Sequence, residues 1–372
     1  MSGWGMKRGR VSLVFLSLAA VVAIGGFWAA RKAPGAGASL GPYYDAQVEA
    51  AELMKRCAVA IRDYRLSLGI LIDPELDPNE TGLIGDEFTD ITTTVGNLEA
   101  KRTATNPAFA ALMVRYFKEA GLGPGDVVAI GASGSFPALI LATLSAARAL
   151  DLEPITVYSI GASMYGATVP ELTFIDMLAR LDEEGLIPYT LAAVSLGGDQ
   201  DTGEGTLFGN GRRVMEEIAR RAGVPVIRED TIVASIQRRL EVYRRQAADR
   251  PIRCFVNIGG ATPNYGNTLT SLDFPNGLVM RPPVMSTAPD RGLIFEFAAA
   301  GIPVINLLDV RGLALKNGLP IDPVPLPPIG EGRIYETTKY SPGVALVTLV
   351  LSAAILWAGA VMDELEPRGR RT

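Results

Sequence analysis

The chain of 372 residues contains no histidine and only two cysteines. Without histidine it cannot form a Ser-His-Asp or Cys-His nucleophile pair, bind a metal through imidazole or use a histidine proton switch. Cys57 and Cys254 lack the CxxC spacing and are too few for a zinc site. Each is predicted to be a small core residue, and a disulfide between them remains open if the domain lies in an oxidising compartment. These absences exclude the commonest hydrolase and zinc-site classes.

Charge is also scarce and nearly balanced. Thirty-five basic residues face 40 acidic ones, for a net charge of −5, so no nucleic-acid partner is expected. Arginines are concentrated between residues 212 and 253. On a helix predicted over 231–247, the apolar stripe leaves Arg238, Arg239, Arg244 and Arg245 mostly on other faces. A solvated face is the favoured interpretation, and a track for a polyanion is the alternative.

Two long apolar runs occupy the ends of the chain. Residues 11–30 and 343–362 contain no charged side chain, and each is long enough to cross a bilayer as a helix. A cleaved signal peptide is the rival for the first run, with Ala36-Gly37-Ala38 as the cleavage site. The length of the run, and Arg31-Lys32 before that site, favour an uncleaved anchor. We therefore predict two transmembrane helices.

The basic residues near these runs predict their orientation. More of them lie beyond the outer ends of the runs than beside the intervening domain, which places both termini in the cytoplasm and the central domain outside it. The outer set is Lys7, Arg8, Arg10, Arg368, Arg370 and Arg371, and the inner set is Arg31, Lys32 and Lys339. The predicted segments are a cytoplasmic N-terminus (1–10), a transmembrane helix (11–30), a membrane-proximal helical and loop region (31–125), an α/β ligand-binding core (126–340), a second transmembrane helix (343–362) and a cytoplasmic tail (363–372).

The middle of the chain alternates strands, glycine-rich loops and helices. A helix is predicted over 43–68 and a loop over 69–105. From Asp126 the short apolar runs predict strands over 126–130, 155–160, 189–196, 252–258 and 303–307. Helices are predicted over 136–150, 170–184, 208–222, 231–247 and 290–300. A capping box at Thr168 and Glu171 is expected to start the second of these helices, and the first is apolar almost all round and should be buried. This alternation predicts an α/β fold, a mostly parallel, doubly wound sheet with helices on both faces.

Unusual residues gather after the predicted strands, where an open parallel sheet binds ligands. Glycine permits close approach of the backbone to a ligand, and hydroxyl or amide groups add donors. The four segments are 131–137, 161–166, 195–201 and 257–264. The predicted ligand-binding residues are Ser133, Gly134, Ser135, Ser163, Gly197, Gly198, Asn257, Gly259, Gly260 and Asn264.

The first segment, GASGSFP, carries the most specific prediction. Free N–H groups at 134–136, the hydroxyls of Ser133 and Ser135, and the positive end of the following helix would make a cradle for a carboxylate or phosphate. The alternative is a tight turn whose serines only cap the helix. A nucleophile at Ser133 or Ser135 is disfavoured, because neither histidine nor lysine lies in this loop.

The segment after residue 198 carries three carboxylates. Asp199, Asp201 and Glu204 could offer oxygen ligands to calcium or magnesium, although a solvated turn is favoured and the spacing is not that of an EF-hand. The chain has neither a GxxxxGK[ST] loop nor a GxGxxG loop directly after a strand. The sequence therefore identifies no cofactor, and a divalent cation stays open.

The order of the four loops resembles a known family. The runs GASGSFPALILATLSAARALDLEP, SIGASMYGATVPELTFIDM, SLGGDQDTGEG and NIGGATPNYGN, behind an N-terminal span, are similar to the poly-gamma-glutamate system protein family over about residues 43–320. The resemblance implies a role in making, exporting or anchoring a poly-gamma-glutamate capsule polymer at the bacterial cell envelope. It implies membrane-bound synthase components as partners, and neither a reaction nor catalytic residues.

Three functions follow as hypotheses. The first is a membrane-anchored accessory protein of the bacterial cytoplasmic membrane that binds anionic groups of poly-gamma-glutamate or its precursor. The second is an enzyme that acts on the polymer or a precursor by acyl transfer or amide hydrolysis through Ser133 or Ser135, without histidine and with a carboxylate or lysine brought in by the fold. The third, by analogy of fold alone, is a sugar-phosphate-binding domain.

Overall fold

The computed structural model describes residues 11–33 and 36–365. The chain separates into two compact units, one formed by the two ends of the chain (1–42 and 336–372) and one by residues 43–335. The basic residues that predict orientation at the outer ends, Lys7, Arg8, Arg10, Arg368, Arg370 and Arg371, lie outside the described residues, as do the predicted N-terminus (1–10) and most of the predicted tail (363–372).

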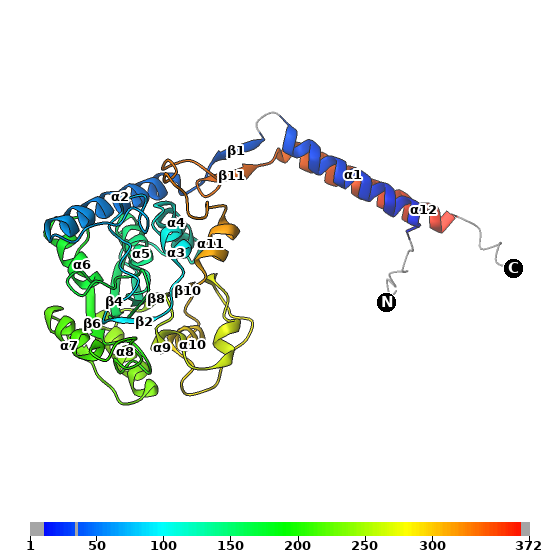
Figure 1. Ribbon diagram of the computed structural model, residues 1–372. Helices are drawn as coiled ribbons and strands as arrows, with labels where there is room; N and C mark the ends of the chain where they lie inside the picture. Colours follow the sequence, from blue (N-terminus) through cyan, green and yellow to red (C-terminus); the bar gives the residue numbers. More distant parts are fainter. Residues whose placement is uncertain (1–10, 34–35, 366–372) are drawn as a thin grey trace. The chain divides into compact units, whose positions relative to one another are not determined.

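The first unit is a pair of helices from the two ends of the chain, which we call the hairpin. Helices α1 (Leu13–Lys32) and α12 (Pro342–Leu365) lie side by side (Figure 1), and both are apolar and long enough to be candidate membrane spans. A Cβ atom at Gly26 would collide with the side chain of Thr348, so the absence of a side chain there permits the helices to approach closely. Strands β1 (Gly37–Leu40) and β11 (Glu336–Lys339) continue the hairpin as an antiparallel pair.

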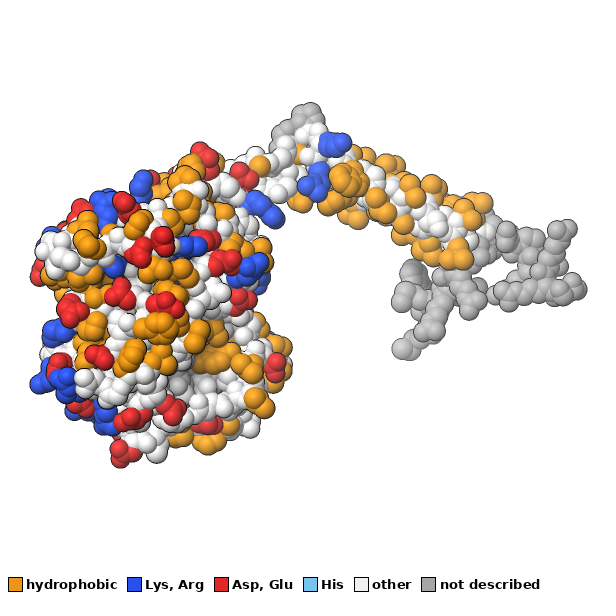
Figure 2. Space-filling view, in the orientation of Figure 1, with side chains coloured by type: hydrophobic (Ala, Val, Ile, Leu, Met, Phe, Trp, Pro, Cys, Tyr) orange, Lys and Arg blue, Asp and Glu red, His pale blue; other side chains and the backbone are white. Residues whose placement is uncertain are grey.

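The surfaces of the two units differ in composition. Figure 2 shows orange apolar side chains along the paired helices, whereas acidic and basic side chains are interspersed over the visible face of the other unit. Apolar side chains such as Leu13, Val21 and Trp357 are more than half exposed on the hairpin. A contiguous apolar surface of this kind is typical of a segment that contacts lipid.

The second unit is built on a seven-stranded sheet in the order β7-β6-β4-β3-β8-β10-β9. All neighbouring pairs are parallel except β10 and β9, which confirms the predicted mostly parallel α/β fold. The strands are β3 (Val127–Ser133), β4 (Glu153–Ser159), β6 (Leu191–Ser195), β7 (Val226–Ile227), β8 (Ile252–Ile258), β9 (Gly277–Val279) and β10 (Val304–Leu307). The chain builds outward from β3 to β7 and then returns to place β8 on the other side of β3. The reversal makes the gap between β3 and β8 the switch point at which such sheets bind ligands.

Helices cover both faces of this sheet, as predicted. Along β3, Val128 and Ile130 point into one hydrophobic core and Val127 and Ala129 into the other, as the two-residue period of a strand requires. Buried side chains of α2 (Tyr44–Ser67), α4 (Ala108–Glu119), α5 (Pro137–Ala149), α6 (Phe174–Glu183), α7 (Gly211–Arg221) and α11 (Val310–Asn317) belong to the first core, and those of α8 (Ile232–Ala247) and α10 (Leu293–Ala299) to the second. Helix α5 is buried on nearly every face, as its composition predicts.

The two cysteines are core residues, as expected. Cys57 on α2 and Cys254 on β8 are both buried and free rather than joined in a disulfide. Burial raises the pKa of the Cys57 thiol to about 12 and raises that of Cys254 as well, so neither thiol is activated.

Several predicted boundaries are wrong for identifiable reasons. The first strand continues to Ser133, because Gly131–Ser133 pair in register with Val157–Ser159 of β4. The capping box lies at Thr173 and Asp176 rather than at Thr168 and Glu171, since the Thr168 hydroxyl donates to the Asp86 carbonyl instead. Two elements stand in the predicted loop over 69–105, β2 (Thr92–Thr94) and α3 (Leu98–Ala104). Strand β2 pairs in parallel with β5 (Ala162–Ser163), a contact that local sequence does not reveal.

The aromatic cluster of the second core predicts a large loss of stability on truncation. The buried Phe255 ring stacks on Phe297 at 4.5 Å between centroids and meets Tyr243 edge-on. Phe255→Ala should lower the free energy of unfolding by about 3–5 kcal/mol, measured by urea denaturation. Leu269→Ala, at a side chain 85% exposed, should change it by less than about 0.5 kcal/mol. Equal effects of the two substitutions would contradict this packing.

Candidate functional site

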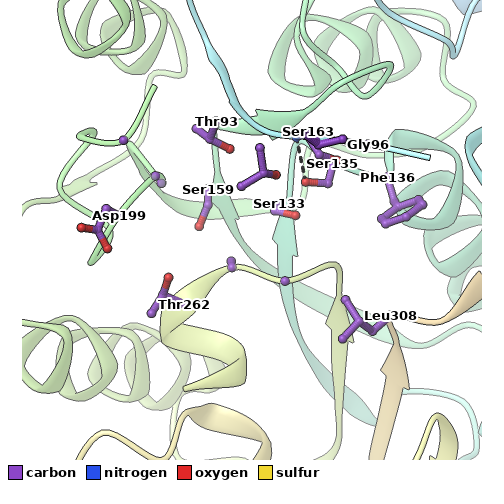
Figure 3. Close-up of a pocket in the computed structure, with 18 of the residues that line it drawn as sticks. Thr93, Gly96, Ser133, Ser135, Phe136, Ser159, Ser163, Asp199, Thr262 and Leu308 are labelled. Carbon is purple, nitrogen blue, oxygen red and sulfur yellow. Dashed lines mark hydrogen bonds between the residues drawn. The ribbon is translucent and has the colours of Figure 1, made fainter. Parts of the chain in front are cut away.

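A cavity of about 530 Å³ lies at the carboxyl ends of β3, β4, β6 and β8, and the four predicted segments all contribute to its wall (Figure 3). The segments meet because parallel strands end at the same rim of the sheet. They contribute Ser133, Ser135 and Phe136, then Gly161 and Ser163, then Gly197, Gly198 and Asp199, and finally Gly260, Ala261 and Thr262. A further wall is formed by residues 93–97, at the end of β2 and just after it, and by Lys101.

Six of the ten predicted ligand-binding residues line this cavity, and four do not. Ser133, Ser135, Ser163, Gly197, Gly198 and Gly260 line it, whereas Gly134, Asn257, Gly259 and Asn264 lie outside its wall.

The four residues outside the wall lie among close backbone contacts or in the buried layer. The Asn257 amide donates to Asn306 Oδ1 at 2.8 Å, and Asn264 is fully buried against Gly131. A Cβ atom at Gly134 would lie 2.6 Å from the Ile160 carbonyl oxygen. Gly259 has a φ of +82° and passes so close to Ser133 that a Cβ atom there would collide with the Ser133 hydroxyl. Glycine at 259 is therefore required by the close approach of two strand ends.

The turn between β3 and α5 has both used and unused backbone N–H groups. The predicted free N–H of Gly134 is in fact used, because it donates to the Ser159 carbonyl at 2.9 Å. Among the hydrogen bonds of the described residues, none uses the N–H of Ser135 or Phe136. Helix α5 begins at Pro137 with Phe136 as its N-cap and no side-chain capping bond, so the two serines do not cap the helix. Two backbone donors and the positive helix end remain available to an anion.

The serine hydroxyls differ in their surroundings. Ser133 Oγ donates a long 3.5 Å bond to the Ile258 carbonyl, and Ser135 Oγ accepts from the Ser163 N–H at 3.1 Å (Figure 3). Within the described part of the chain, neither hydroxyl contacts a side chain that could act as a base. The geometry thus gives no support to Ser133 or Ser135 as an activated nucleophile.

Lys101 is the residue that sequence reasoning missed. It lies on α3, whose N-cap Asn97 accepts a bond from the Ala100 N–H at 2.8 Å. The Lys101 side chain is almost fully buried, and its Nζ donates to Ser163 Oγ at 2.6 Å and to the Ser135 carbonyl. Nζ also lies 4.1 Å from the centroid of the Phe136 ring, a cation–π distance. An Asn-capped helix start was the only local signal, and it does not indicate where the lysine points.

Burial controls the charge of this amine. It lowers the pKa of Lys101 from its ordinary 10.5 to about 7. No acidic side chain among the described residues forms an ion pair with Lys101. Near neutral pH the amine therefore exchanges readily between a charged form that attracts anions and a neutral form that can accept a proton.

Arg239 is also buried, contrary to the prediction that it lies on a solvated face. Its Nη2 donates to Asp201 Oδ2 at 2.9 Å, to Ser195 Oγ at 2.6 Å and to Ser159 Oγ at 3.0 Å. Arg239 lies one helical turn after Ser235, which also donates to Asp201, so both face the strand ends. The prediction failed because Arg239 lies on the side of α8 that borders its apolar stripe. The buried pair fixes the loop after β6 beside the cavity.

The three candidate metal ligands do not form a common oxygen site. Asp199 lines the cavity, Asp201 pairs with Arg239, and Glu204 pairs with Arg212 at 2.9 Å. Within residues 11–33 and 36–365, no group of three or more Asp, Glu, Cys or His side chains is arranged to hold a metal ion. The geometry does not support the divalent-cation alternative at these residues.

The buried amine predicts a pH-dependent stability. Because its pKa is lower in the folded than in the unfolded protein, the unfolded chain binds more protons between about pH 7 and 10.5, and stability should rise with pH across this window. Lys101→Met should remove that rise and be more stable than wild type at about pH 6, by on the order of 1–4 kcal/mol. Urea denaturation from about pH 6 to about pH 10 measures both effects. Lys55→Met, at an exposed lysine of α2, is the matched control, and a Lys101→Met protein with the wild-type pH slope would contradict the assignment.

No family model, curated protein or solved structure matches this chain. The site is therefore interpreted from its geometry alone.

Proposed function

We propose that this protein is a membrane-anchored accessory protein of poly-gamma-glutamate biosynthesis, export or anchoring, and that its cavity binds anionic groups of the polymer or its precursor. The observation that carries the proposal is the meeting of four Gly/Ser-rich turns around the buried amine of Lys101, which forms no ion pair with an acidic side chain of the described residues. The polymer's identity comes from the resemblance of those four loops to the family.

The chemistry of the cavity suits a carboxylate. A bound anion would supply the opposite charge that Lys101 lacks, and would accept from the unused N–H groups of Ser135 and Phe136. The glycines at 197, 198 and 260 leave the backbone accessible. The volume of about 530 Å³ is within the ordinary range for a small-molecule site and suits a short stretch of polymer. A phosphosugar remains a competitor, since phosphate satisfies the same donors.

Binding should therefore depend on the charge of Lys101. Glutamate oligomers titrated into the full-length protein in detergent should bind most tightly below about pH 7, where the Lys101 amine is charged. As pH rises the free protein loses this charge, whereas a bound anion raises the pKa of the amine and so favours the charged form. Affinity should therefore fall by up to about tenfold per pH unit. Lys101→Met should lose most of the affinity and its pH dependence, while Lys55→Met should bind like wild type. Calorimetry with a phosphosugar as competitor separates the two ligand classes. Binding by Lys101→Met equal to that of wild type would overturn the proposal.

The membrane arrangement is part of the proposal. If α1 and α12 both cross the bilayer, their arrangement as a pair continued by the antiparallel strands β1 and β11 places the two ends of the chain on the same side. We assign that side to the cytoplasm of a bacterium and the unit 43–335 to the outside, where the polymer and membrane-bound synthase components would be its partners.

Labelling in spheroplasts tests this topology. Leu269→Cys puts a thiol on an exposed position of the outer unit, and both native cysteines are buried, so background labelling should be low. A membrane-impermeant maleimide should modify this variant in intact spheroplasts, and a C-terminal green fluorescent fusion should fluoresce. Labelling only after lysis would contradict the orientation. The intact mass separates an uncleaved anchor from a chain cut near Ala36-Gly37-Ala38.

A further inference from the structure

One hydroxyl of the cavity differs from the others because it touches an amine. Ser163 Oγ accepts from Lys101 Nζ at 2.6 Å, across 62 positions of sequence. Both groups line the same cavity, and both are buried at its wall. In a chain without histidine, a lysine amine in contact with a serine hydroxyl is an arrangement that can activate the serine.

The surrounding backbone holds Ser163 in a defined position. Ser163 pairs with Thr94 in the short β2–β5 sheet, and its N–H donates to Ser135 Oγ at 3.1 Å. A tight turn follows at once: the Gly166 N–H donates to the Ser163 carbonyl at 3.0 Å, and Tyr165 adopts a left-handed φ of 62°. A non-glycine residue in this region is strained, and such strain commonly accompanies functional sites.

We propose that Ser163 is a nucleophile and Lys101 its general base, and that this pair catalyses acyl transfer or hydrolysis on an amide of the γ-glutamyl class. The pair goes beyond the binding role, and only its choice of substrate rests on the proposed function. It also relocates the catalytic alternative from Ser133 and Ser135 to Ser163.

The protonation state of Lys101 supports this assignment. A base must be neutral to accept a proton, and burial brings the pKa of Lys101 to about 7, so a substantial fraction is neutral at physiological pH. The groups in contact with Nζ are the Ser135 carbonyl, the Phe136 ring and the Ser163 hydroxyl, none of which carries charge. Asp199 is the acidic side chain on the wall of the same cavity, and burial alone accounts for the lowered pKa.

The reaction balances without any further reagent. Ser163 Oγ forms a bond to the amide carbonyl carbon while its proton moves to Lys101 Nζ. The C–N bond then breaks, the leaving nitrogen takes that proton, and an amine departs, which leaves the acyl group as an ester on Ser163. Water adds to the ester carbonyl and gives a proton to Lys101, and Ser163 Oγ leaves with that proton to release the carboxylic acid. An amine in place of water would complete acyl transfer instead.

Backbone donors are available for the charge that develops in this reaction. The N–H groups of Ser135 and Phe136 belong to the turn whose carbonyl Lys101 contacts, and no hydrogen bond among the described residues uses them. Donors of this kind, preorganised beside a reacting carbonyl, stabilise its oxyanion. The rival explanation is structural, in which Lys101 only ties α3 to the β3–α5 turn and β5.

A fluorophosphonate tests the pair without reference to the polymer. The Ser163 oxygen should displace fluoride from the phosphorus of the probe, and peptide mass spectrometry of the full-length protein in detergent should locate the adduct at Ser163. The rate should rise with pH through about 7, and Lys101→Met should lower it by at least about 100-fold. Lys101→Arg retains a charged donor but cannot be neutral, so it should be as slow as Lys101→Met.

Matched controls and outcomes decide the test. Ser67→Ala and Lys55→Met, both at exposed positions of α2, should react like wild type. Denaturation curves establish that each variant is folded. Absence of an adduct at Ser163 in wild type, or wild-type reactivity of Lys101→Arg, would overturn the pair and favour the structural explanation.

A second experiment tests the substrate. Wild-type protein incubated with poly-gamma-glutamate in ¹⁸O-labelled water should generate new amino termini and new carboxyl groups, and each new carboxyl group should carry one ¹⁸O atom. Ser163→Ala should reduce the rate by at least about 100-fold. Polymer that binds but keeps its length, while Ser163 still reacts with the fluorophosphonate, would overturn the γ-glutamyl substrate and leave the pair standing. Failure of wild type to bind polymer would overturn the proposed function, and the fluorophosphonate result would still decide the pair.

Discussion

Parallel strands all end at one rim of their sheet, and the candidate site depends on this constraint. Turns that are far apart in sequence come together because β3, β4, β6 and β8 run in the same direction. The change of winding direction between β3 and β8 opens the rim at that point, since the connections on its two sides lead away from each other. Gly197, Gly198 and Gly260 contribute only backbone to the cavity wall, and outside the wall Gly259 passes close to the Ser133 hydroxyl.

Two buried cations at this rim have opposite roles. The charge of Arg239 is balanced by the carboxylate of Asp201, and its guanidinium also donates to three serine hydroxyls. These contacts hold the loop after β6 in place. Removing one partner of such a pair costs several kcal/mol, typically about 3–5, which is characteristic of a structural element. Lys101 has neutral contacts, and burial leaves its amine easily discharged. The charged amine destabilises the folded protein, and this destabilisation is relieved when the amine loses its proton or when an anion binds beside it.

In the proposed function, the hairpin of α1 and α12 would hold the cavity at a membrane. The missing side chain at Gly26 lets the helices meet closely against Thr348, and many exposed apolar side chains lie on the remaining surface. A polymer with a carboxylate on every unit would repel an anionic membrane surface, and a tethered domain with a cationic pocket would keep it nearby. The proposed binding role and the proposed Ser163–Lys101 chemistry both benefit from such tethering, because it raises the local concentration of polymer at the cavity.

The sequence by itself determined the features that depend on neighbouring residues: the two apolar spans, the alternation of strands and helices, the buried character of α5 and the glycine-rich turns after the strands. These follow from hydrophobic periodicity and turn chemistry, which act over a few residues. Only the tertiary structure decided that Ser133 still belongs to β3, that Arg239 points inward to Asp201, and that Lys101 reaches Ser163 through the pairing of β2 with β5. The physical reason is that each of these contacts joins segments of chain whose approach is set by packing of the whole sheet and its helices. A polar side chain on a short helix carries no local sign of whether it faces water or a cavity.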